Sequence, residues 1–242
     1  LELNKACADG DLGGVKKLVA AVKNLNRVID GDTPLTSASR WAHVEVAAFL
    51  VANGADVNYE GSDDSALHCA IRSRDRDMVR LLLEAGANPN AYCKTFGQPA
   101  LELALCMQRA DIATELLNFG ASIELSSPDG PPMSQLLGCG GDELLGAVCR
   151  KPKWFSVTMP DGFPLLHSLA FWGRTKYIQR AAMDGADINA LSEGDMRTTP
   201  LHQASLNGGA RTVRALLDLG ADSDARDGMG YTPLELALLR VQ

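Results

Sequence analysis

The 242-residue chain has few of the residues that build catalytic, nucleic-acid-binding or membrane-spanning proteins. It has only four histidines, and aromatic residues make up 5% of its length. Its apolar runs are short and interrupted by charge, so we predict neither a signal peptide nor insertion into a membrane. Its net charge of -7 argues against nucleic acid as a partner, because such binding depends on neutralising phosphates.

The six cysteines show no Cys-x-x-Cys spacing and stand far apart, at positions 7, 69, 93, 106, 139 and 149. Scattered thiols of this kind are typical of reduced, structural cysteines rather than of a disulfide framework. We therefore expect an intracellular protein, either cytoplasmic or nuclear.

No set of residues predicts catalysis. The glycine-rich stretch Gly138-Cys139-Gly140-Gly141 lacks the lysine and the preceding strand of a phosphate-binding loop. His68, His167 and His202 recur at one position of a repeat, and His43 lies in a turn, so structural roles explain all four. We expect no enzymatic activity, no metal site and no cofactor.

The most informative feature of the chain is a short sequence motif that recurs about every 33 residues. Thr33-Pro34-Leu35, Thr199-Pro200-Leu201 and Thr232-Pro233-Leu234 are its clearest copies. We call the leucine of each copy the anchor leucine; the series is Leu3, Leu35, Leu67, Leu101, Ser134 in place of leucine, Leu166, Leu201 and Leu234. A threonine before proline predicts a helix start, since its hydroxyl caps free N–H groups and proline fits the first helical position.

A second landmark, Gly-Ala followed by a polar residue, falls 19 residues after five of the anchors, beginning with Gly54-Ala55-Asp56. Between the two landmarks lies a second apolar set with the spacing of one helix face, such as Val46, Ala47 and Leu50. The closing glycine suits the left-handed position that ends a helix. Each unit therefore reads as helix, turn, helix and projecting loop, and the whole chain as a repeat protein.

This unit resembles the ankyrin repeat, whose pattern is Gly-x-Thr-Pro-Leu-His-x-Ala, then Val-x-x-Leu-Leu, then Gly-Ala-Asp-Val-Asn. The best copies are Gly31 to Asn58 and Thr199 to Asp224. The resemblance implies an all-α solenoid of seven to eight helix-turn-helix units with projecting β-hairpin-like loops. We expect one array over residues 1–242: a partial first repeat 1–26, repeats 27–58, 59–90 and 91–123, a degenerate repeat 126–158, repeats 159–190 and 191–225, and a truncated last repeat 227–242.

Residues 126–158 keep the repeat spacing of about 33 residues but lack the Thr-Pro-Leu and Gly-Ala landmarks. Ser134 replaces the anchor leucine, and several prolines and glycines weaken the first helix. The segment is either a decayed repeat held by its neighbours or a hinge or docking site with exposed Trp154 and Phe155. We also expect the loop from Leu191 to Thr198 to be longer than the others.

Large apolar residues occupy variable positions that stacking of repeats does not require. In ankyrin arrays the loop tips and the exposed side of the first helices line one concave surface, and aromatic residues and methionine are common interface anchors. The resemblance places these residues there: Trp41, Phe96, Met107, Phe163, Phe171, Trp172, Met196, Leu206 and Tyr231. We expect its centre near Phe163, Phe171 and Trp172, with Arg40, Arg72 and Asp64 as polar flanks. Some of these side chains could instead fold back onto neighbouring loops.

Two loop asparagines, Asn58 and Asn90, have a plain role in loop hydrogen bonding; the resemblance also allows hydroxylation by an oxygenase. The sequence stops eight residues after Leu234, which would leave Leu236, Leu238, Leu239 and Val241 partly uncovered. We therefore expect either an excised domain of a longer polypeptide or a chain whose tail is missing.

The expected function is a monomeric, non-catalytic module that binds a protein or peptide on its concave face. The alternative is a regulatory or targeting domain of a larger enzyme, ubiquitin ligase adaptor or channel.

Overall fold

The computed structural model describes residues 2–59, 64–95, 97–123, 141–158 and 162–239. It divides into two compact units, Leu1–Ser122 and Ile123–Gln242, which we call unit 1 and unit 2. Each unit is built from short antiparallel helix pairs joined by loops, as the repeat pattern predicted.

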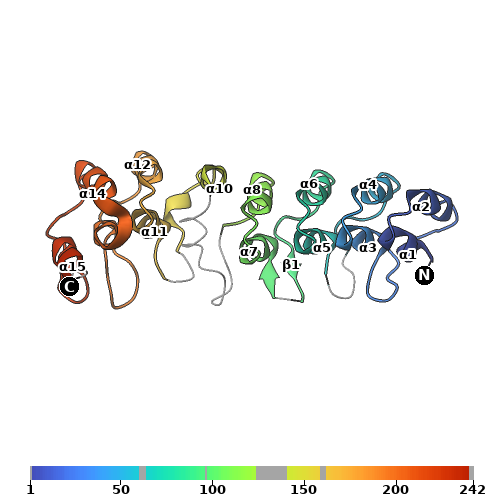
Figure 1. Cartoon of the computed structure of the whole chain (residues 1–242), viewed down its shortest axis with the longest axis horizontal. Coiled ribbons are helices and arrows are strands. Elements are labelled where there is room, and N and C mark those ends of the chain that lie inside the picture. The colour runs from blue at the N-terminus through green and yellow to red at the C-terminus, as the bar shows by residue number, and fades with distance from the viewer. Residues whose placement is uncertain (1, 60–63, 96, 124–140, 159–161, 240–242) are drawn as a thin grey trace. The chain divides into compact units, whose positions relative to one another are not determined.

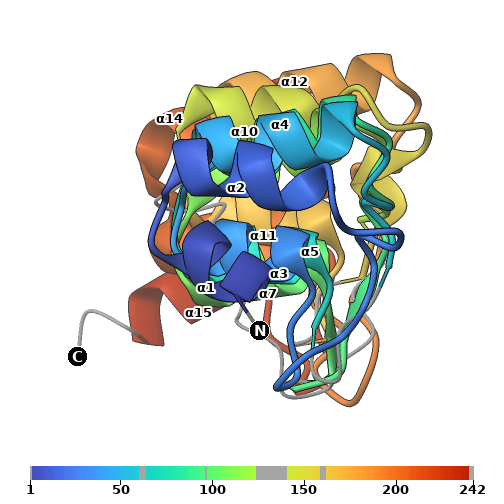
Figure 2. The ribbon, with the colours of Figure 1, turned by 90° about the vertical axis from the view of Figure 1, so that its right-hand side faces the viewer.

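The described residues of unit 1 form four helix pairs and one small hairpin. Their bounds are α1 Glu2–Ala8, α2 Leu12–Val19, α3 Pro34–Arg40, α4 Val44–Ala52, α5 Ala66–Arg72, α6 Arg76–Glu84, β1 Tyr92–Cys93, β2 Gln98–Pro99, α7 Ala100–Cys106 and α8 Ala110–Asn118. The first helices of the pairs pack in one row and the second helices in another (Figure 1). The connecting loops of this unit project beyond the row of first helices (Figure 2).

Unit 2 repeats the same two rows with local departures. Its elements are α10 Asp142–Val148, the 3₁₀ helix η1 Trp154–Ser156, α11 Leu165–Phe171, α12 Thr175–Met183, α13 Pro200–Gln203, the π-helical turn η2 Ala204–Gly208, α14 Gly209–Asp218 and α15 Pro233–Leu239. Helix α13 packs between α11 and α15, and α14 packs on α12.

Reciprocal caps start the helices α3 and α13, which begin at the proline of Thr-Pro-Leu, and this confirms the sequence prediction. The Thr33 hydroxyl accepts a hydrogen bond from the backbone N–H of Thr36 at 3.1 Å, and the Thr33 N–H donates to the Thr36 hydroxyl at 2.7 Å. Thr199 forms the same pair of bonds with His202. Each cap satisfies N–H groups that have no partner within the helix.

The helices α4, α6, α8, α12 and α14 are each followed by a glycine with positive φ, from 89° at Gly220 to 99° at Gly120. A side chain at such a position would be strained, whereas glycine adopts it freely. The backbone N–H of the following alanine then bonds back into the helix, as Ala55 does to the carbonyl of Leu50 at 3.0 Å. The closing Gly-Ala landmark is therefore a helix stop.

The core of each unit consists of the anchor leucines and one face of the second helices. Leu35, Leu67, Leu101, Leu166 and Leu201 are only 1–2% exposed. In four of the second helices, three residues at positions i, i+1 and i+4 are also buried; they are Val46, Ala47 and Leu50 in α4, Met78, Val79 and Leu82 in α6, Ile112, Ala113 and Leu116 in α8, and Tyr177, Ile178 and Ala181 in α12. This spacing places them on one side of the helix.

Asparagines tie successive loops together. The Asn58 amide donates to the Gly86 carbonyl at 3.0 Å and accepts from the Asn88 N–H at 2.8 Å. Asn90 makes the same two bonds to Gly120 and Ser122, and Asn189 to Gly220 and Asp222. The structure thus shows the hydrogen-bonding role expected for Asn58 and Asn90.

Of the two alternatives for residues 126–158, the one with an exposed Trp154 is wrong on that point. Its side chain is only 1% exposed, because η1 packs against α11 and the indole nitrogen donates to Asp184 Oδ2 at 2.9 Å. Phe155 lies edge-on to Trp154, with ring centroids 6.0 Å apart, and is half-buried. The expected second helix of this repeat is present as α10. Residues 124–140, including Ser134, lie outside the described residues.

Candidate interaction surface

Three of the candidate residues occupy one structural position, the C-cap of a first helix. Trp41 ends α3, Met107 ends α7 and Trp172 ends α11. Trp41 is 61% exposed, and the other two are half-buried. The repeat fold therefore directs a large apolar side chain toward the edge of the first-helix row in three helix pairs. We call the loop tips and the exposed side of the first helices of each unit its first-helix surface.

In unit 2 the structure brings part of the candidate set together. The rings of Phe171 and Trp172 lie edge to face, with centroids 5.3 Å apart and planes at 82°. The Asn207 amide donates to the Phe171 carbonyl at 3.2 Å, which holds the turn that carries Leu206 against this pair. Phe163 lies just before the start of α11, with its ring centroid 6.3 Å from that of the buried His167. All four apolar side chains are half-buried, so each has contacts and a solvent-facing part.

The remaining candidates lie in loops. Met196, in the long loop 191–198, is 46% exposed, and its backbone carbonyl accepts from the Gly228 N–H. Tyr231 is half-buried, and its carbonyl accepts from His202 Nε2 at 3.0 Å. Phe96 lies outside the described residues. The long loop is closed at its base by Ser192 and Thr198, whose backbone N–H and carbonyl groups are 2.8 Å apart.

In unit 1, the equivalent positions at the ends of α3 and α5, and in the loops before these helices, hold ion pairs rather than aromatic rings. Arg40 contacts Asp32 at 2.7 Å, and Arg72 contacts Asp64 at 2.8 Å. Asp64 was expected as a polar flank of the surface, but its side chain is fully buried, because the loop of β1 covers it. The side chains of Arg40, Asp32 and Arg72 remain partly accessible.

The buried Asp64 carboxylate is held in its charged form. Burial by itself would raise the pKa of Asp64, but hydrogen bonds from Cys93 Sγ and the Thr95 hydroxyl, with the charge of Arg72, outweigh it and lower the pKa. These bonds are 3.0 and 3.1 Å long. The site is a structural clamp between two successive loops.

The histidines at the recurring position all bond to the next loop. Nε2 of His68, His167 and His202 lies 2.8–3.1 Å from the carbonyls of Ala91, Thr198 and Tyr231, respectively. Burial lowers the pKa of His167 to about 4, so its ring is neutral at pH 7. Burial also raises the pKa of the Cys7 thiol to about 12. Within the part of the chain that the structure describes, no three His, Cys, Asp or Glu side chains gather as metal ligands.

Comparison with known families shows that most of these helix pairs match models of one repeat family. A model of ankyrin repeats in three copies matches residues 3–93 and 63–127, and a model of many ankyrin copies matches residues 184–237. The chain belongs to the ankyrin repeat family. The ankyrin pattern explains the cap, the buried histidine position and the Gly-Ala turn, and ankyrin repeats generally mediate contacts between proteins.

Individual relatives are moderately similar. The chain is 28% identical over 217 residues to human ankyrin repeat and SOCS box protein 16, matching 86% of this chain and 48% of that protein. It is 32% identical over 221 residues to human transient receptor potential cation channel subfamily A member 1, covering 85% of this chain and 19% of that protein. The crystal structure of the human ASB11 ankyrin repeat domain matches with a TM-score of 0.46 at 23% identity, covering 98% of this chain and 91% of that chain. The chain therefore spans about half or less of the curated relatives named here.

Tyr92 and Leu234 are among the exposed apolar residues that the repeat pattern did not predict. Tyr92, in the β1 strand, is 54% exposed. Leu234 and Leu238 of α15 are 68% and 59% exposed, although Leu234 has the sequence signal of a buried anchor. Exposure of Leu238 and Leu239 follows the expectation for the last repeat. None of the described helices is both long and apolar enough to span a membrane.

Proposed function

We propose that this ankyrin chain is a non-catalytic module that binds a protein or an extended peptide on its first-helix surface. The observation that carries the proposal is the 61% exposure of Trp41, a side chain that stacking of the repeats leaves in solvent. Exposed aromatic side chains on a rigid scaffold are frequent hot spots of protein interfaces. The stiff helix pairs lose little conformational entropy when a partner binds, which favours affinity.

Unit 2 has a first-helix surface of its own. Phe171 and Trp172 hold each other in place through their edge-to-face contact, and Leu206 extends the apolar area. A partner with aliphatic or aromatic residues would bury these half-exposed rings. The paired guanidinium groups of Arg40 and Arg72 offer hydrogen-bond donors at the equivalent positions of unit 1.

The test is a binding comparison after partners have been captured from an extract of the native cells. Phe171→Ala with Trp172→Ala should weaken binding of the captured partner by about 2–4 kcal/mol, which is roughly 30- to 700-fold in affinity. Trp41→Ala tests unit 1 in the same way. Phe119→Ala is the matched control, because Phe119 is an exposed aromatic residue at the C-cap of a second helix. Unchanged affinity in both test variants would refute the proposed surface.

A second candidate function follows from coverage of the relatives. The chain matches 48% of one relative and 19% of another, a cation channel by name. On this reading the array is a targeting or regulatory part of a larger protein, and its reduced cysteines suit an intracellular location. The nucleotide sequence on either side of the coding region for residues 1–242 decides between the two.

A further inference from the structure

The first turns of α12 and α14 carry cations at a position where the preceding second helices carry acids. The position is the residue directly before the first member of the i, i+1 and i+4 pattern. It holds an acid in four helices and then a base in two: Glu45 in α4, Asp77 in α6, Asp111 in α8, Glu143 in α10, Lys176 in α12 and Arg211 in α14. The charge at this position therefore reverses within unit 2.

This reversal is electrostatically unfavourable for the two helices. A helix N-terminus carries a partial positive charge, which favours acidic side chains in the first turn and disfavours basic ones. Neither α12 nor α14 has an acidic residue there. The Lys176 ammonium lies 3.6 Å from Asp142 Oδ2, but these side chains are 75% and 69% exposed, so the pair adds little stability. Residues that break a local rule of stability in this way indicate a functional surface.

The two cations belong to neighbouring turns. The hydroxyl groups of Thr175 and Thr212 are 3.0 Å apart, so the first turns of α12 and α14 lie side by side. Lys176 and Arg211 are the sequence neighbours of these threonines, and both are exposed. Within the described part of the chain, Arg211 has no ion-pair partner. Its charge is therefore available to a binding partner.

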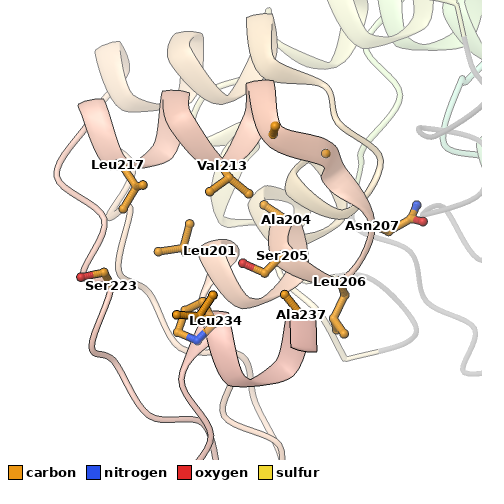
Figure 3. Close-up of a pocket in the computed structure, with 13 residues that line it drawn as sticks. Leu201, Ala204, Ser205, Leu206, Asn207, Val213, Leu217, Ser223, Leu234 and Ala237 are labelled. Carbon is orange, nitrogen blue, oxygen red and sulfur yellow. The ribbon is translucent and has the colours of Figure 1, made fainter. Parts of the chain in front are cut away.

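An aromatic pair borders the cations. Trp172 is the C-cap of α11, and Thr175 begins α12 three residues later. The hydrogen bond from the Asn207 amide to the Phe171 carbonyl ties the turn before α14 to the same place. Figure 3 shows Asn207 directed away from the pocket between α14 and α15, whereas Leu206 lines that pocket.

We call Phe171, Trp172, Lys176 and Arg211 the turn edge of unit 2. Leu206 is left out of this set, because it also belongs to the pocket between α14 and α15.

A following helix pair does not bury this edge. Glu45 and Asp77 have the position of Lys176 and Arg211, and both are exposed although a further helix pair follows each of them. Trp41, at the position of Trp172, is 61% exposed in the same setting. The exposure of the turn edge is therefore a property of the repeat itself.

We propose that the turn edge of unit 2 binds an acidic segment of a partner protein. One aromatic or aliphatic residue of the segment packs on Phe171 and Trp172. Carboxylates on either side of that residue face Lys176 and Arg211. The inference rests on the proposed function and adds the chemistry of the partner.

Charge complementarity determines the choice of an acidic protein segment. The chain has a net charge of -7, yet two neighbouring first turns in it contain cations and no acid. Opposite charges across an interface select the correct partner and speed its encounter. A long polyanion such as nucleic acid is disfavoured, because the negative charge of the rest of the chain repels it.

An unbiased library of displayed peptides tests the chemistry of the partner. Peptides of about 12 residues, which extend over roughly 40 Å, are selected on the whole chain. We expect the selected peptides to be enriched in aspartate and glutamate around an aromatic or aliphatic residue. Selection on the double variant Lys176→Glu with Arg211→Glu should lose the enrichment in acids.

A labelled peptide from this selection then gives affinities by fluorescence anisotropy. The double variant should bind it about tenfold more weakly. Raising the salt concentration from about 50 to about 300 mM should weaken binding by the unsubstituted chain more than by the variant. Lys17→Glu with Lys23→Glu is the matched control, because it changes the net charge equally at exposed lysines of unit 1. Its affinity should stay within about twofold of the unsubstituted chain.

Thermal unfolding separates a binding role from a structural one. Lys176→Glu with Arg211→Glu should unfold at a higher temperature than the unsubstituted chain, because glutamate restores the acidic first turn of α4 and α6. A lower unfolding temperature would show that the two cations stabilise the fold, and it would overturn the inference.

The outcomes distinguish this inference from the proposed function. Selected peptides that require Phe171 and Trp172 but show no enrichment in acids would overturn the inference and leave the proposed function standing. Acidic peptides that bind equally after Phe171→Ala with Trp172→Ala would contradict the proposed surface.

The inference also fails if the library yields no peptide, or if the double variant binds as tightly as the unsubstituted chain. Equal competition by a single-stranded oligonucleotide would replace the protein segment with nucleic acid as the occupant. Self-association in analytical ultracentrifugation that the double variant abolishes would replace it with a second copy of the chain.

Discussion

The indole nitrogen of Trp154 and the carboxylate of Asp184 lie 2.9 Å apart and join two successive helix pairs of unit 2. Asp184 is the C-cap of α12, and Arg180 Nε donates to the same carboxylate oxygen at 2.8 Å. A segment that has lost the Gly-Ala landmark is thus fixed by a tryptophan at the place where the landmark would be. The bond replaces part of the missing backbone turn with a side-chain contact.

Replacing Trp154 tests this substitute contact. Trp154→Phe should lower the free energy of unfolding by about 1–2 kcal/mol, because it removes ring volume from a buried site and the bond to Asp184. Urea denaturation measures the change. Trp172→Phe is the control, since Trp172 is half-exposed, and it should change stability by less than half as much. Equal effects would contradict the role assigned to Trp154.

The asparagine ladder should contribute to stability between repeats. Asn58→Ala removes the bonds to Gly86 and Asn88 and should cost about 1 kcal/mol, because water can replace part of these exposed bonds. Asn53→Ala is the matched control, since the Asn53 amide bonds only to the Phe49 carbonyl of its own helix. Hydrogen exchange of the Asn88 amide should accelerate in the first variant and stay slow in the second.

The two Asp–Arg pairs of unit 1 should differ in how much they contribute to the free energy of unfolding. Asp64→Asn leaves the guanidinium of Arg72 without its charge partner and should destabilise by on the order of 2–3 kcal/mol. Asp32→Asn breaks the equivalent pair, but the Asp32 and Arg40 side chains are 25% and 32% exposed, so the cost should be about 1 kcal/mol or less. Thermal unfolding of both variants gives the comparison. A larger loss for Asp32→Asn would refute the clamp at Asp64.

The buried imidazole of His167 predicts a loss of stability in mild acid. Burial lowers the pKa of His167 from 6.5 to about 4. Between these values the unfolded chain binds a proton that the folded chain does not. The stabilisation is therefore complete above pH 6.5 and falls as the pH drops toward 4, by on the order of 3 kcal/mol.

Urea denaturation at pH 7, 6 and 5 measures the dependence on His167. His167→Gln retains a donor for the Thr198 carbonyl but cannot titrate, so its stability should fall less over this range. The same pH slope in both proteins would show that other groups cause it.

Local chemistry made much of the fold predictable. Thr33 and Thr199 predict helix starts because the threonine hydroxyl caps the backbone N–H three residues on. Gly120 predicts a helix end because glycine adopts its positive φ without strain. The hydrogen bonds of Asn58 repeat with the sequence period. Burial of Leu67 follows from the same period, because it lies between two complete helix pairs.

Local sequence patterns did not determine which side chains are buried; only the tertiary structure decided that. Trp154 looks like a candidate for exposure and is buried; Asp64 looks like a surface carboxylate and is enclosed by the next loop. Leu234 carries the same Thr-Pro-Leu signal as Leu201, yet one is 68% exposed and the other 2%. A residue's own repeat sets its conformation, but its burial depends on the helix or loop that the neighbouring repeat lays over it.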